Sequence, residues 1–144
     1  MIESKLLDTN ILVYAFDTSD KVKHGIAKKL LETCISRKEQ FYISTQNISE
    51  FYHVITKYVE NPLPKSEARV ICEKFICFSG FVKLSPTSYA LLGAMKIDEK
   101  FKVGYWDALI AATMIENGIN TIITENKKDF QKIPGVIILD PFSK

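Results

Sequence analysis

Short apolar segments alternate along the chain with longer stretches whose apolar residues recur every three or four positions. Five of the short segments have the length and composition of buried β-strands: Ser4 to Leu7, Gln40 to Ser44, Phe81 to Leu84, Asn120 to Thr124 and Val136 to Leu139. Helices are predicted between them: Lys21 to Ser36, Thr45 to Val59, about Ser66 to Phe78, one opened by Ser85-Pro86-Thr87, and Tyr105 to Asn117. This alternation predicts an α/β fold with a parallel sheet covered on both faces.

Composition limits the classes of protein that fit. The 144 residues suffice for one domain, spanning 1–144, and a net charge of +2 does not indicate a nucleic-acid binder. The three cysteines lack the spacing of a zinc site, so we expect reduced core residues. No apolar run has the length of a signal peptide or a membrane span, which predicts a cytoplasmic protein without membrane contact.

Polar residues occur at four predicted element boundaries. Asp8 closes the first strand, Glu50 lies early in the helix after the second strand, Asp107 opens a helix, and Asn126 follows the fourth strand. Because right-handed crossovers bring the carboxyl ends of parallel strands to one edge, these positions are expected to converge there. Carboxylates gathered in one pocket repel each other and need protons or a hard divalent cation. The pattern therefore suggests a metal-dependent active site.

Each position also has an ordinary structural explanation. Asp8 could make only a turn contact, and Glu50 could be a solvated helix residue. Asp107 would be favoured at a helix N-terminus by the helix dipole, although its neighbours are unusually apolar. Asn126 alone is typical of a turn or a cap.

Taken together, four segments resemble a PIN domain, and most closely the small bacterial and archaeal VapC-type toxins. They are Leu7-Asp8-Thr9-Asn10-Ile11-Leu12, Ile48-Ser49-Glu50-Phe51, Tyr105-Trp106-Asp107-Ala108-Leu109-Ile110-Ala111-Ala112 and Thr124-Glu125-Asn126. The resemblance extends from about Lys5 to Asp140. It implies a three-layer α/β/α sandwich, bound Mg²⁺ or Mn²⁺, and endoribonuclease activity on structured or single-stranded RNA. It also implies a toxin of a toxin–antitoxin pair, with a small antitoxin and a second copy of the chain as partners.

Carried over by position, the resemblance assigns metal binding to Asp8, Glu50 and Asp107, and catalysis to these three with Asn126. Asn10 and Thr124 match small polar positions around the cluster. Asn126 departs from the fourth acidic position of the family, which makes a second tightly bound metal less secure. Asp129 lies three residues further on and could supply a nearby carboxylate.

Other polar and aromatic residues are expected to have ordinary roles. His53 forms a single Glu-x-x-His pair with Glu50, which is weak evidence for a metal ligand. The lysines are expected on solvated helix faces, although the groups before Asp107 and after Asn126 flank the predicted site and could hold phosphates. Trp106 could offer a stacking surface, but we expect it to pack in the core.

Two other functions remain open at this point. A haloacid-dehalogenase-type phosphoryl-transfer enzyme would use an Asp nucleophile after the first strand, and Asp8 fits. Its second Asp is missing, because Asn10 stands there. A non-catalytic PIN-like nucleic-acid-binding or scaffold protein is the other alternative. The three carboxylates argue against it, whereas Asn126 leaves it open.

Overall fold

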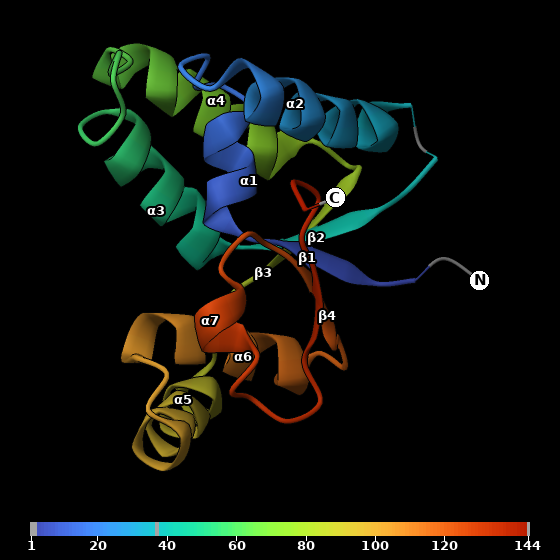
Figure 1. Ribbon diagram of the computed structural model, residues 1–144, viewed down its shortest axis with the longest axis vertical. Helices are drawn as coiled ribbons and strands as arrows, with labels where there is room; N and C mark the ends of the chain where they lie inside the picture. Colours follow the sequence, from blue (N-terminus) through green and yellow to red (C-terminus); the bar gives the residue numbers. More distant parts are fainter. Residues whose placement is uncertain (1–2, 37, 144) are drawn as a thin grey trace.

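A five-stranded parallel sheet divides the helices into two layers (Figure 1). The computed structural model describes residues 3–36 and 38–143. The strands follow the order β3-β2-β1-β4-β5, and all neighbouring pairs are parallel: β1 (Lys5–Leu7), β2 (Phe41–Ser44), β3 (Phe81–Leu84), β4 (Thr121–Ile123) and β5 (Ile137–Leu139). One layer holds α1 (Thr9–Tyr14), α2 (Lys21–Ile35), α3 (Thr45–Ile55) and α4 (Lys65–Cys77). The other holds α5 (Ser88–Phe101), α6 (Tyr105–Glu116) and α7 (Lys127–Phe130). The predicted α/β/α sandwich is confirmed.

Alternate strand residues enter the two layers because successive side chains of a strand point to opposite faces. Leu7 and Ile123 belong to the core between the sheet and α1 to α4. Their neighbours Leu6 and Ile122 pack instead with Ile110 and other residues of the α5 to α7 layer. All five side chains are at most 4 % exposed. The central strands are therefore buried on both faces, as parallel sheets require.

The strand order reverses direction between β1 and β4. From β1 the chain builds outward through β2 to β3, then crosses back to place β4 and β5 on the other side of β1. Open parallel sheets form their ligand crevices at such a switch point, beyond the carboxyl ends of the strands. At that end, α3 of one layer approaches α6 of the other (Figure 1).

Helices α1 and α3 differ from the sequence prediction. Helix α1 was not predicted, because six residues are too few for a helical period to stand out. Helix α3 ends at Ile55, not at Val59. The chain turns after Thr56, yet Val59 still packs against the core. Its apolar side chain therefore continued the helical spacing in the sequence, although the helix had ended.

The cysteine prediction is correct in part. All three thiols are free, and Cys34 is buried. Cys72 is only partly buried, and Cys77 is exposed, so the expectation of a core position is wrong for Cys77. Within the described residues, no helix has both the length and the apolar character needed to cross a membrane.

Candidate active site

Asp8 lies at the switch point, between the end of β1 and the start of α1. It is the N-cap of α1, and its Oδ1 accepts a hydrogen bond from the Thr9 backbone N–H at 2.8 Å. Its Oδ2 accepts from the Thr124 hydroxyl at 2.8 Å and from the Asn10 side-chain amide at 3.3 Å. The side chain is 5 % exposed, and burial raises its pKa from 3.8 to about 6 despite these bonds, with a contribution from the Glu50 charge. The fold therefore holds the Asp8 carboxylate in one orientation, while burial makes its ionised form less stable.

Asn47 supports Asp8 from the second strand–helix junction. Its Oδ1 accepts from the Ser44 backbone N–H at 2.9 Å, completing a capping box at the start of α3. Its Nδ2 donates to the Thr9 hydroxyl at 3.1 Å and reaches Asp8 at 3.5 Å. Asn47 is fully buried, so it ties the start of α3 to the start of α1. Asn47 was not predicted as a site residue, although its place three residues after Ser44 was a capping signal.

Glu50 reaches the same region from α3. Its Oε1 accepts from the Gln46 side-chain amide at 2.7 Å, and its Oε2 accepts from the Thr9 hydroxyl at 3.4 Å. Gln46 also donates to the backbone carbonyl of Trp106 at 2.9 Å. One amide thus links Glu50 on α3 to the first turn of α6.

Asp107 stands in the first turn of α6 beside a second carboxyl group. The Asn126 side-chain amide donates both to Asp107 Oδ2 at 3.0 Å and to Asp129 Oδ2 at 3.3 Å. The pKa of Asp107 is raised from 3.8 to about 7, first by burial, then by a hydrogen bond with Asp129 and by the charges of Asp8 and Asp129. The Asn126 amide opposes this rise. At neutral pH Asp107 therefore holds a proton more readily than an ordinary carboxyl group does.

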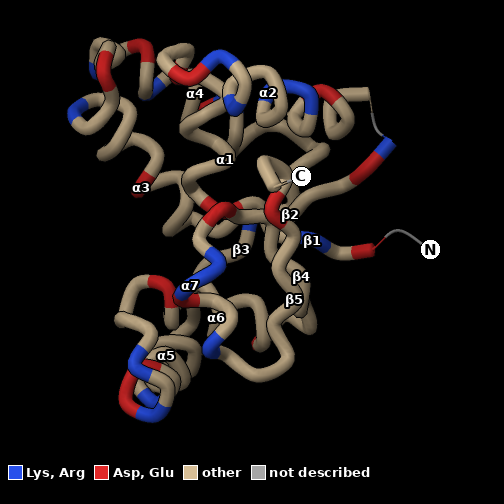
Figure 2. The backbone as a smooth tube through the Cα atoms, in the orientation of Figure 1, with Lys and Arg blue, Asp and Glu red and all other residues tan. Residues whose placement is uncertain are grey.

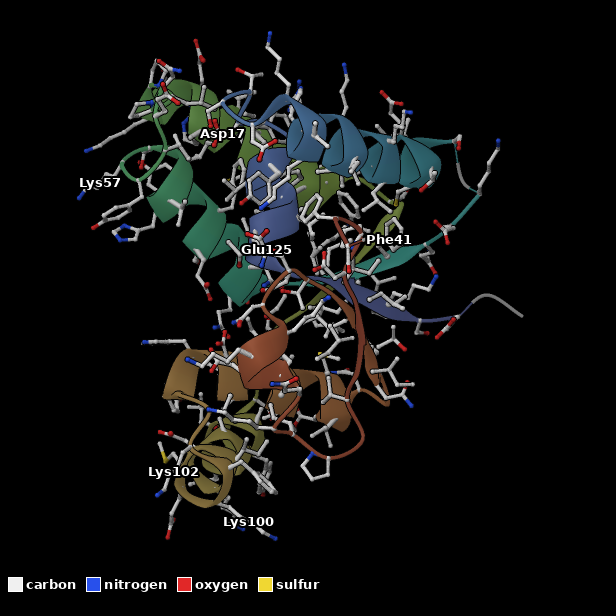
Figure 3. All side chains as sticks on the ribbon, in the orientation of Figure 1. Asp17, Phe41, Lys57, Lys100, Lys102 and Glu125 are labelled. Atoms are coloured by element: carbon white, nitrogen blue, oxygen red, sulfur yellow. The ribbon has the colours of Figure 1, made fainter. Side chains whose placement is uncertain are left out.

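The structure brings all four predicted site residues to one cleft. Asp8, Glu50, Asp107 and Asn126 line a cavity of about 390 Å³. Asp17 also lines it, from the segment between α1 and α2 (Figure 3), and no motif around this residue predicted its place there. The cleft is therefore acidic, and the catalytic and metal-binding roles of its residues stay predictions.

The donor chemistry of this cleft suits a hard cation. Within residues 3–36 and 38–143, no three His, Cys, Asp or Glu side chains lie close enough to hold a metal ion as they stand. The carboxylates instead accept hydrogen bonds from hydroxyls and amides. Magnesium prefers oxygen ligands and keeps several waters, so a pair of carboxylates can suffice. Asp8 and Asp107 fit this requirement best, because burial raises the pKa of both, and Glu50 lines the same cleft.

A second polar network fixes the loop after β4. Lys23 Nζ forms an ion pair with Glu125 Oε2 at 2.8 Å, and the Tyr14 hydroxyl donates to Glu125 Oε1 at 2.8 Å. The backbone N–H of Glu125 donates to Asn10 Oδ1 at 3.3 Å. Glu125 can be seen in this loop in Figure 3. These bonds hold Thr124 and Asn126, the residues on either side of Glu125, beside the acidic cleft.

The remaining predicted residues lie outside the cleft. His53 is exposed and packs edge-on against Tyr58, with ring centroids 5.1 Å apart. Basic residues are spread over α2, α4 and α5, with a further group on α7 (Figure 2). Lys127 of α7 pairs with Asp140, and Lys132, which follows α7, lies 4.0 Å from Asp129. Trp106 is 65 % exposed, so the prediction that it packs in the core is wrong.

An acidic cleft at the switch point of a parallel α/β/α sandwich defines a class of α/β domains that gather carboxylates at the carboxyl edge of the sheet. Within this class, the PIN domain family model matches residues 5–136. The chain belongs to the PIN domain family.

Solved structures show the same fold over nearly the whole chain. A chain of a toxin–antitoxin complex from Klebsiella pneumoniae is 26 % identical with a TM-score of 0.66, covering 97 % of this chain and 99 % of that one. VapBC from Salmonella typhimurium, bound to DNA, is 23 % identical with a TM-score of 0.68, covering 98 % and 99 %. Mycobacterium tuberculosis VapC20, described as a sarcin-ricin loop cleaving toxin, is 17 % identical with a TM-score of 0.70, covering 88 % and 92 %. No curated protein matches the sequence.

Proposed function

We propose that this protein is a metal-dependent endoribonuclease and the toxin of a type II toxin–antitoxin pair. The observation that carries the proposal is the convergence of Asp8, Glu50, Asp107 and Asn126 from four separate segments on one cleft of a PIN domain. The similar structures support the toxin role, because several are toxin–antitoxin complexes.

The residues of the cleft would have different roles in metal binding and in positioning. Asp8, Glu50 and Asp107 would hold Mg²⁺ or Mn²⁺, which lowers the pKa of a bound water and neutralises phosphate charge. Thr124 and Asn10 would keep Asp8 oriented through the hydrogen bonds described above. Asn126 would orient Asp107 without adding negative charge.

Two rival functions make different predictions. A non-catalytic PIN-like nucleic-acid-binding or scaffold protein is favoured by the neutral Asn126, and it would bind RNA without cleaving it. In a haloacid-dehalogenase-type enzyme, the residue two positions after Asp8 would be an acid. Here it is Asn10, which donates its amide to Asp8 and cannot act as an acid. Membership of the PIN family also argues against that mechanism.

Incubation with mixed cellular RNA, with Mg²⁺, with Mn²⁺ and with chelator, tests the proposal. We expect metal-dependent internal cleavage that falls at least about a thousandfold in Asp8→Asn and Asp107→Asn, since metal-assisted charge stabilisation contributes several kcal/mol. Glu99→Gln, which removes an exposed carboxylate of α5, is the matched control and should keep full activity. Binding of RNA without cleavage under every metal condition would establish the scaffold alternative.

We also propose a cognate antitoxin and a second copy of the chain as protein partners. Tyr89, Leu92 and Met95 expose 82 %, 56 % and 51 % of their surface on α5, three residues apart, and so form one apolar stripe on this helix. A second copy would bury this stripe. Light scattering should show a dimer that Leu92→Glu converts to a monomer, whereas Val22→Glu, at an exposed apolar residue of α2, should stay dimeric. A monomeric wild-type chain would contradict the homodimer.

A further inference from the structure

Trp106 is an exposed aromatic side chain next to a proposed catalytic residue. It is the chain's one tryptophan, it precedes Asp107 in the first turn of α6, and it is 65 % exposed. Tyr105, which is partly buried, contacts it edge-on with ring centroids 5.1 Å apart. An exposed indole loses the contribution that its large apolar surface would make in the core. Its position and its support by Tyr105 suggest a binding role.

A hollow of about 400 Å³ separates Trp106 from one face of α3. The α3 residues that line it recur at helical spacing: Gln46, Ser49, Glu50, His53 and Val54. This volume lies within the range of small-ligand sites, roughly 300–1,000 Å³. The hollow is thus large enough for a planar ring, with the indole on one side.

The hollow continues directly into the acidic cleft. Glu50 and Val54 line both cavities. Gln46 fixes the junction, because its side-chain amide donates to Glu50 and to the Trp106 carbonyl. A group bound in the hollow would therefore lie beside the carboxylates, at a distance that the fold keeps constant.

One polar atom of the junction lacks a hydrogen-bond partner. The side-chain oxygen Oε1 of Gln46 is buried and accepts no hydrogen bond from any described residue. A buried acceptor without a donor is costly, so Gln46 is held in place by the two hydrogen bonds that its amide group donates and not by this oxygen. Nucleobases combine flat apolar faces with polar edges, which suits a hollow lined by the Trp106 indole and by polar residues of α3 such as Ser49 and Gln46.

We propose that this hollow binds one unpaired nucleobase of the substrate, stacked on Trp106, next to the phosphate to be cleaved. The inference rests on the proposed nuclease function and narrows its substrate to RNA with a single-stranded or extruded base at the cleavage site. Bases in an A-form duplex are stacked on their neighbours and cannot enter such a hollow, whereas unstacked bases pack well on aromatic side chains.

The fluorescence of Trp106 reports this contact directly, because no other tryptophan contributes. The experiment uses Asp8→Asn as a cleavage-deficient background, since Asp8 does not line the hollow. A short single-stranded RNA should quench the emission saturably. The same sequence as a blunt duplex, and a strand of equal length with abasic sugars, should not. Equal quenching by all three probes would overturn the proposal, because it would report backbone binding alone.

Variants test whether the stacking contributes to binding. In the same background, RNA affinity measured by anisotropy should fall about five- to a hundredfold in Trp106→Ala and stay near wild type in Trp106→Phe, as for other base–aromatic stacks. With Asp8 intact, Trp106→Ala should raise KM more than it lowers kcat. Ile115→Ala, at an exposed apolar residue in the last turn of α6, is the matched control and should change neither quantity.

Failure of this inference and failure of the proposed function look different. If the wild type cleaves RNA and Trp106→Ala binds RNA with unchanged affinity, the nucleobase site is disproved and the nuclease function is supported. A different result would be quenching by single strands and weakened binding in Trp106→Ala, with no cleavage under any metal condition. It would support the nucleobase site and disprove the nuclease function. Thermal melting of each Trp106 variant checks that a loss of binding is not a loss of fold.

Discussion

Asp8 and Asp107 line the same cleft but are held in different ways. Asp8 is buried and accepts hydrogen bonds from donors on three segments, namely the start of α1, the start of α3 and the end of β4. Asp107 is only partly buried, its hydrogen-bond donor is the Asn126 amide, and its next neighbour is the carboxyl group of Asp129. One carboxylate is surrounded by donors, and the other faces a second acid.

The surroundings of Asp8 mainly fix the orientation of its carboxylate, whereas the surroundings of Asp107 mainly affect its charge. Both groups have a raised pKa, so the protein bears an electrostatic cost on each side of the cleft. On the Asp8 side the surrounding hydrogen bonds also join β1, α1, α3 and β4, so the fold depends on that network. On the Asp107 side, burial, a hydrogen bond with Asp129 and the charges of Asp8 and Asp129 all disfavour the ionised form of Asp107, and a cation or a proton relieves this cost.

The largest expected effect on stability concerns Asn47, at the centre of the Asp8 network. Asn47→Ala removes the capping box of α3 and leaves the Ser44 N–H and the Thr9 hydroxyl without this partner. We expect a loss of about 2–4 kcal/mol in the free energy of unfolding, measured with urea. Asn117→Ala, which removes one hydrogen bond to Thr113 at the end of α6, should cost about 0.5–1.5 kcal/mol. Equal losses in the two variants would show that the Asp8 network contributes no extra stability.

The pH dependence of stability in chelator tests the buried charge of Asp8. Below about pH 4 both the folded and the unfolded state carry the proton, so the raised pKa costs nothing. As the pH rises, the unfolded chain ionises first, and stability falls until the pH passes the folded pKa of about 6. We expect a loss of about 3 kcal/mol from Asp8 between about pH 4 and pH 7, at about 1.4 kcal/mol per pKa unit.

Urea unfolding of Asp8→Asn measured across the same range isolates this contribution. The variant should lose less stability with rising pH than the wild type. Identical slopes would mean that Asp8 keeps an ordinary pKa in the folded protein.

Asp107→Asn should behave differently from changes on the Asp8 side. It removes one member of the repelling pair with Asp129, so the melting temperature in chelator at neutral pH should be unchanged or raised, by roughly 1 kcal/mol in stability after allowing for solvent screening. Asp129→Asn should have the same sign, and Glu99→Gln should have no effect. A large loss of stability in Asp107→Asn would show that Asp107 is mainly a structural hydrogen-bonding residue.

The smallest expected effect is on metal affinity at Asn126. Asn126→Asp adds a carboxylate to the Asp107 side and should tighten manganese binding about three- to tenfold in calorimetric titration, because affinity follows the charge of the ligand set. Asn126→Ala should keep most of the affinity, since Asp8, Glu50 and Asp107 remain. If Asn126→Asp leaves the affinity unchanged, Asn126 acts through its amide on Asp107 and Asp129 and lies outside the metal shell.

The alternation of strands and helices was readable from the sequence, and so was the position of each predicted site residue. Residues such as Leu6 and Leu7 are buried on both faces of a parallel sheet, which produces continuous apolar segments. Since the carboxyl ends of parallel strands share an edge, the placement of Asp8 and Asp107 at element boundaries was enough to predict a common cleft. The short helices α1 and α7 were not predicted, because four to six residues show no clear helical period of apolar positions.

The tertiary structure alone decided which groups meet within that cleft. Periodicity indicates that a side chain is buried or exposed relative to its own helix, but not which segment packs over it. The pairing of Asp107 with Asp129 and the support of Asp8 by Asn47 depend on how separate loops meet at the switch point. Trp106 was expected in the core because large aromatic side chains usually pack there, yet it lies at the first turn of α6, where the hollow beside α3 leaves it uncovered. Its exposure follows from the gap between α3 and α6, which no local pattern of residues encodes.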